Sequence, residues 1–387
     1  HLLALIDPRK MFANTMLGFT ECFKYDLSCS QVALNGISGG SALFSFTGLS
    51  FSLGKRSLDY VQKHLSTKDD NVSLYYYKMF ETIHNYLTGN WDQDMGEDFV
   101  DYGIKIGEIY CAATHLLYIG YIYLDRGDFD YTKSLIEKLH LVSEQFNTDH
   151  AAVMFYTLKG LLLKKLTRLQ EASETINKGL DLAQKIGLTN RILSFLGMQL
   201  QVQVMLNDHV RTEEILARCK AIISRQSNIT PYYYSSFLLG NFLYNLNCLE
   251  KSLVSRDNAP GSKYKRLAFK SGKKLLKNSE KIVSEKARAF CLMGRYYWLA
   301  ACPDKAIQFW SRALQEGDNL GLRPDIAYTY LEVGKRLQES ENKYKRFQGK
   351  QGKDCLEKAK ILFQEMDIDI EEIDRTYRDN YQERASC

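Results

Sequence analysis

Residues 292–317 read LMGRYYWLAACPDKAIQFWSRALQEG, and their pattern is the clearest indication of how the chain folds. Two apolar runs at helical spacing flank the turn-forming CPD segment, and each run carries small residues where a neighbouring helix can approach closely. The same small positions occur twice in the chain, with spacings of 12 and 7 in both cases: Gly160, Ala172 and Gly179, then Gly294, Ala306 and Ala313. The pattern predicts a unit of two short helices joined by a tight turn.

Small residues return inside apolar runs along most of the chain, at steps of 34 to 54 residues. We expect them, together with Ala172 and Ala306, to be helix-packing positions: Gly48, Thr82, Gly120, Gly160, Gly197, Gly240, Gly294 and Gly334. A period near 40 is typical of repeat arrays. The sequence therefore predicts an all-α, right-handed superhelical solenoid of about eight helix pairs with an elongated shape.

The repeat divides the chain into three regions. Residues 1–38 are expected to form an irregular N-terminal cap or the end of a preceding repeat, 39–367 the repeat array, and 368–387 a charged C-terminal tail. Two units carry extra polar length, which predicts loops at 253–266 and 340–354. The predicted pairs are 40–52 with 56–66, 73–88 with 96–108, 110–125 with 129–146, 150–166 with 169–185, 190–206 with 210–224, 231–247 with 263–281, 284–300 with 303–316, and 325–339 with 351–366.

Composition indicates a folded helical protein. Hydrophobic residues make up 45% of the chain and charged residues 25%, which excludes intrinsic disorder, and only 5 prolines interrupt the helical spacing. The 9 cysteines form no CxxC pair, which favours a reducing, cytoplasmic location. No apolar run is long enough for a membrane span. Because the chain opens on His1, we expect it to be part of a longer protein.

No catalytic, metal or cofactor site is expected. The segment Gly48–Lys55, GLSFSLGK, resembles a phosphate-binding loop but has five residues between its glycines, and Arg56 stands where Ser or Thr is needed. Asn90, Asp92, Asp94, Asp98 and Asp101 have calcium-loop offsets, but Met95 replaces the required sixth-position glycine. We interpret the first segment as a repeat turn and the second as an acidic turn that leads into the first turn of a helix, where carboxylates suit the exposed amides.

A basic ridge is the strongest local charge feature. Its members fall largely on one side of a predicted helix: Lys263, Lys265, Arg266, Lys270, Lys273, Lys274, Lys277 and Lys281. Three alternatives stay open here, namely a solvated face, a docking site for an acidic protein partner, and a site for RNA or phosphoinositide. Nucleic acid is the less expected partner, because the net charge is only +5 and no recognition aromatics interleave the ridge.

The repeat resembles the tetratricopeptide family. In residues 292–317, Gly294, Tyr297, Ala306, Phe309 and Ala313 occupy the family's positions, whereas Thr82 and Thr132 depart from the pattern elsewhere. The resemblance implies a scaffold that binds proteins rather than small cofactors.

A narrower resemblance concerns the last pair. GLRPDIAYTYLEVGKRLQ at 321–338 and CLEKAKILFQEMDID at 355–369 are similar to the closing repeats of signalling ATPases of the soluble adenylyl cyclase type. That resemblance implies a non-catalytic C-terminal region of a cyclic AMP-producing enzyme. We therefore expect a scaffold or regulatory platform in a large cytosolic or ciliary signalling assembly, with a cyclase tail or an RNA-binding adaptor as the alternatives.

Overall fold

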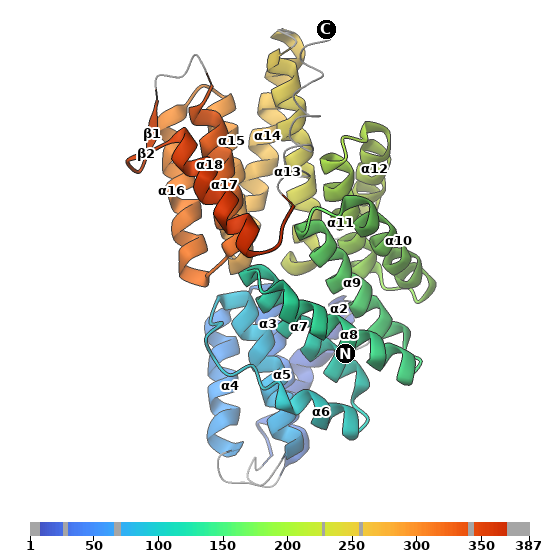
Figure 1. Ribbon diagram of the computed structural model, residues 1–387. Helices are drawn as coiled ribbons and strands as arrows, with labels where there is room; N and C mark the ends of the chain where they lie inside the picture. The colour runs from blue at the N-terminus through green and yellow to red at the C-terminus, as the bar shows by residue number, and fades with distance from the viewer. Residues whose placement is uncertain are drawn as a thin grey trace.

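The protein is an array of paired α-helices (Figure 1). The computed structural model describes residues 8–25, 30–65, 71–226, 229–254, 258–339 and 344–369, and these contain 17 α-helices, one short 3-10 helix and one two-stranded hairpin. The predicted all-α class and repeat arrangement are confirmed.

One helix, α2 (Pro8–Cys22), precedes eight helix pairs. The pairs are α3 (Gln31–Thr47) with α4 (Phe51–Leu65), α5 (Asn71–Thr88) with α6 (Asp98–Lys105), α7 (Ile109–Arg126) with α8 (Phe129–Gln145), α9 (Asp149–Lys165) with α10 (Leu169–Lys185), α11 (Thr189–Met205) with α12 (His209–Arg225), α13 (Pro231–Val254) with α14 (Asn258–Ser279), α15 (Lys286–Leu299) with α16 (Pro303–Leu320), and α17 (Arg323–Leu337) with α18 (Gly352–Glu365). The 3-10 helix η1 (Val283–Glu285) leads into α15.

Two local features keep the turn between the two helices of a pair short. The chain leaves several first helices through a residue with positive φ, such as Gly127 (81°) after α7 and Asn207 (59°) after α11. An aspartate then starts the second helix, because the side chains of Asp128 and Asp208 accept hydrogen bonds from the free backbone amides of α8 and α12. Glycine and asparagine tolerate the left-handed conformation that such a turn requires.

The structure differs from the sequence prediction at three places. Helix α3 runs unbroken from Gln31 to Thr47, so it spans the boundary expected between 38 and 39. The described residues of the loop expected at 253–266 are helical, because α13 extends to Val254 and α14 already begins at Asn258. Within the second insertion, β1 (Arg346–Phe347) and β2 (Lys350–Gln351) form a hairpin that buries Phe347. Residues 370–387 of the predicted tail lie outside the described residues.

The array curls back on itself, which an elongated solenoid does not do. Tyr86 of α5 accepts a 3.3 Å hydrogen bond from Ser284 of η1. Gly89 lies against Leu320 of α16, Gly127 against Pro324 of α17, and Phe46 of α3 against Tyr232 of α13. In Figure 1 the orange and red helices accordingly sit on the end of the blue and cyan ones. None of the described helices is long and apolar enough to cross a membrane.

Candidate functional site

Helix α14 concentrates the positive charge of the chain. Its 22 residues include seven lysines and arginines and no acidic residue, whereas the whole chain has a net charge of +5. The rest of the chain therefore carries a net charge of −2. Ala268 and Leu275 are fully buried, and Gly272 lies against Phe242 of α13 and Met293 of α15. This packing fixes which face of α14 turns to solvent.

The basic face of α14 consists of Lys263, Arg266, Lys270, Lys273, Lys274 and Lys277. All six side chains are exposed. At 100° per residue they fall within an arc of about 100°, and they span about 21 Å along the helix axis. A contiguous single-sign strip of this length is suited to a partner of opposite charge.

No carboxylate of the described residues lies within 4.0 Å of these six side chains. Lys263 instead lies over the ring of Tyr264 and Lys273 over Phe269, at 5.9 and 5.5 Å from the ring centroids. The other two members of the predicted ridge point elsewhere. Lys265 donates to the carbonyl of Ala300 at 3.4 Å, and Lys281 packs its aliphatic stem against Gly48.

The predicted helix-packing glycines that lie inside helices have two kinds of neighbour. Gly160, Gly294 and Gly334 each face the second helix of their own unit, at Ile176, Trp310 and Leu356. Gly120, Gly197 and Gly240 face the first helix of an adjacent unit, at Leu158, Ser236 and Leu200. Ala172 and Ala306 are fully buried.

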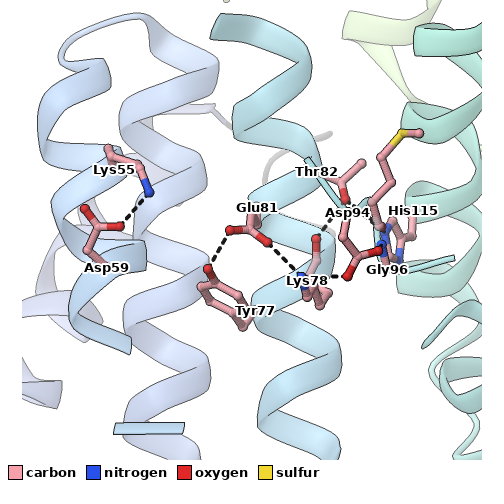
Figure 2. A network of polar contacts seen from close by, with 10 residues as sticks. Lys55, Asp59, Tyr77, Lys78, Glu81, Thr82, Asp94, Gly96 and His115 are labelled. Atoms are coloured by element: carbon pink, nitrogen blue, oxygen red, sulfur yellow. Dashed lines mark hydrogen bonds and ion pairs between the residues drawn. The ribbon is translucent and has the colours of Figure 1, made fainter. Parts of the chain in front are cut away.

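Gly48 differs from the other glycines, because it ends a helix instead of lying inside one. It is the C-cap of α3, with φ of 59°, and its amide donates to the carbonyl of Ser45. From Phe51 onward the phosphate-loop-like segment belongs to α4, where Gly54 is buried and Lys55 forms a 2.6 Å ion pair with Asp59 (Figure 2). Helical backbone at this place leaves no loop of amides to surround a phosphate.

The carboxylates of the calcium-loop-like segment point to three different helices. Asp92 pairs with Arg126 of α7, Asp94 with Lys78 of α5 at 3.0 Å, and Asp101 with Lys138 of α8 at 2.6 Å. Figure 2 shows Lys78 between Asp94 and Glu81, with Tyr77 donating to Glu81. The Gly96 amide and Lys78 together lower the pKa of Asp94. The described residues contain no group of three His, Cys, Asp or Glu side chains that could hold a metal.

Thr82 replaces the repeat glycine with a polar contact. Its hydroxyl lies 2.9 Å from the Met95 carbonyl and 3.1 Å from His115 Nε2, which itself lies 2.7 Å from that carbonyl (Figure 2). Burial lowers the pKa of His115 to about 4. A neutral imidazole that donates from Nε2 to Met95 fits this geometry. These contacts fix the segment between α5 and α6, so Thr82 and His115 stabilise the turn.

A cavity of about 150 Å³ lies where the array closes. The first helices of four units and η1 contribute six charged side chains to its wall: Asp125, Lys164, Lys165, Glu285, Arg288 and Asp325. Sequence analysis missed this site. These residues lie near the ends of five different elements, where a charged side chain is ordinarily solvated, and the closure of the array brings the five elements together.

A second buried charge cluster joins α13, α15 and α17. Arg336 contacts Glu250 at 2.8 Å and Glu332 at 2.7 Å, and Arg295 also pairs with Glu250. Burial alone would raise the pKa of Glu250, but the two arginines hold it well below its usual range. With every charged group paired, this cluster connects three units and offers no open position for a ligand.

Comparison with known proteins adds no relative from which a role could be transferred. No protein-family model matches the chain, and no curated protein matches its sequence. The fold and the surfaces described above are therefore the basis for assigning a function to this helical-repeat protein.

Proposed function

We propose that this chain is a non-catalytic, tetratricopeptide-like scaffold that binds a protein partner, and that the basic face of α14 docks an acidic segment of that partner. The single observation that carries the proposal is the excess charge of α14, which exceeds that of the whole chain and is not neutralised by described carboxylates. A folded protein gains little from such a strip, since neighbouring like charges repel one another.

An acidic protein fits the surface better than RNA does. Single-stranded nucleic acid binds by stacking its bases on open aromatic rings as well as by phosphate contacts. Tyr264 and Phe269 are the rings adjoining the basic face, and Lys263 and Lys273 lie over them. A lysine thus already lies over each ring, although Phe269 is 38% exposed, whereas carboxylates need only the exposed ammonium and guanidinium groups.

The wider setting is also a proposal. The resemblance of residues 321–338 and 355–369 to the closing repeats of soluble adenylyl cyclase-type proteins supports a role within a cytosolic or ciliary signalling assembly. Those residues form α17, α18 and the turn after α18. In the alternative, the chain is the regulatory tail of such a cyclase, and the same basic face serves contacts within the enzyme.

The test uses a fluorescent 20-residue polyglutamate peptide and a 20-nucleotide mixed-sequence RNA, titrated by anisotropy. We expect the peptide to bind, with affinity falling as salt rises. Reversal of Lys270, Lys273, Lys274 and Lys277 to Glu should abolish binding and leave the helical circular dichroism intact, because exposed charges contribute little to folding.

The matched control reverses four exposed lysines on other helices, Lys178, Lys220, Lys358 and Lys360, and so changes the net charge equally. It should retain most of the peptide affinity. Equal loss in both variants would mean that only net charge matters and would contradict the docking site. Tighter binding of the RNA than of the peptide, lost on reversal of α14, would favour the nucleic-acid alternative instead.

A further inference from the structure

The cavity at the closure of the array has an unusual charge arrangement. Two of its three cations have carboxylate partners: Lys165 pairs with Asp125 at 3.0 Å, and Arg288 lies 3.9 Å from Asp325. These four side chains keep 14 to 23% of their surface accessible because they face the hollow. The cavity is therefore open to water-sized molecules and lined by charged groups that keep part of their surface accessible.

Lys164 and Glu285 are the remaining pair of opposite charges. Lys164 Nζ donates to Gln201 at 2.6 Å, but no carboxylate of the described residues lies within 4.0 Å of it. Glu285 likewise has no cationic group of the described chain within 4.0 Å. Each nevertheless acts on the other electrostatically across the hollow. Both side chains line the cavity, and they are not in direct contact with each other.

The pKa values of Lys164 and Glu285 reflect the absence of an opposite charge in direct contact with either group among the described residues. Burial, together with Lys165, lowers the pKa of Lys164 to about 8, and burial raises the pKa of Glu285. Both shifts disfavour the charged forms, and a bound group of opposite charge would reverse them. The Ser235 hydroxyl, buried at the same wall, faces Glu285 without a hydrogen bond of normal geometry. A donor and an acceptor on a ligand would satisfy these groups.

The size of the hollow limits what it can hold. At about 30 Å³ per water molecule, 150 Å³ corresponds to about five waters. This volume is too small for a nucleotide or a drug-sized molecule, which need 300 Å³ or more. Leu161, Met198 and Leu239 form an apolar part of the wall, which would suit a short side chain.

We propose that this cavity binds a free α-amino acid, with the ligand carboxylate at Lys164 and the ligand ammonium at Glu285. A zwitterion of this kind fills the gap between the two charges and leaves the net charge of the cavity unchanged. Its binding would join α9 to η1, two elements that meet only through closure of the array. The ligand would therefore stabilise the closed form of the scaffold.

The experiment measures the melting temperature of the full chain with each of the twenty protein amino acids at 10 mM, followed by calorimetric titration of any that stabilise it. We expect at least one amino acid to bind with 1:1 stoichiometry. Acetate and ethylammonium, which carry only one of the two charges, should bind at least tenfold more weakly at the same pH.

Variants locate the site. Lys164→Met and Glu285→Gln should each weaken binding at least tenfold, whereas Lys159→Met, an exposed lysine on the same helix, should leave it unchanged. Because Lys164→Met removes a buried charge, its fold is checked by circular dichroism, and Glu285→Gln provides the independent, nearly isosteric arm. The proposal is overturned if no amino acid binds the wild-type chain, if acetate binds as tightly as the best amino acid, or if both cavity variants retain full affinity.

Discussion

Replacing Gly197 with alanine tests how closely the first helices of adjacent units approach. A Cβ atom added at Gly197 would lie 2.7 Å from the backbone carbon of Ser236 and even closer to the backbone nitrogen of Phe237 on α13. Backbone atoms cannot rotate out of the way, so α11 and α13 would have to separate. Overpacking of this kind costs up to about 3 kcal/mol. Alanine returns about 1 kcal/mol through its higher helix propensity, so the expected net loss is about 2 kcal/mol.

Gly18→Ala is the matched control. Gly18 is an exposed glycine inside α2 with no atom within 4 Å of an added Cβ, so only the propensity gain remains and the variant should be slightly more stable. Urea unfolding followed by circular dichroism, with the slope unchanged, gives both free-energy differences. If Gly197→Ala is as stable as the wild type, α11 and α13 do not approach backbone to backbone, and the repeat core is not close-packed at this crossing.

Three further outcomes are expected. Burial lowers the pKa of His84 and of His115 to about 4, so between pH 6.5 and 4 the unfolded chain binds more protons than the folded chain does. The free energy of unfolding should therefore decrease as the pH falls through that window, by up to roughly 1.4 kcal/mol per pH unit for each histidine. A urea midpoint that stays constant from pH 6.5 to 4 would contradict the burial of both histidines as neutral rings. Arg336→Met should destabilise the protein by about 3 to 5 kcal/mol because Glu250 and Glu332 lose their buried partner, whereas Arg346→Met on the exposed hairpin should change the urea midpoint little. The chain should neither hydrolyse ATP nor form cyclic AMP in a coupled assay, and turnover lost specifically in Lys55→Ala would show that the segment at Gly48–Lys55 is a nucleotide site after all.

The repeat fold could be predicted from sequence because its signals are local. Apolar residues at helical spacing and turn-forming residues between them recur in nearly every unit, and the predicted ranges 129–146 and 169–185 correspond closely to α8 and α10. The role of Gly48 was harder to foresee. A glycine after an apolar run serves equally as an internal packing residue and as a left-handed C-cap, and only the backbone φ of 59° distinguishes the two.

The two candidate sites, the basic face of α14 and the charged cavity, also differ in how far local sequence predicts them. The basic face of α14 lies on one helix, so periodicity alone identifies most of its members, although it cannot show that Lys281 turns aside to cover Gly48. The charged cavity depends on residues far apart in the chain that act on one another electrostatically, for example Lys164 with Glu285 and Asp125 with Asp325. Nothing in a single sequence indicates that a helical array closes, because closure depends on small rotations summed over all units.

Closure of the array has a consequence for the synthesis of the protein. The hydrogen bond between Tyr86 and Ser284 cannot form until Ser284 has been synthesised, and Ser284 lies 198 residues further along the chain. At 5 to 20 residues per second, the ribosome needs about 10 to 40 s to supply it. During that time the aromatic inner wall formed by Tyr86, Tyr118 and Tyr121 has no cover from the later units. The nascent chain therefore exposes this aromatic wall until the later units are synthesised. A chaperone that binds the early helices until η1 emerges would have most effect at this surface.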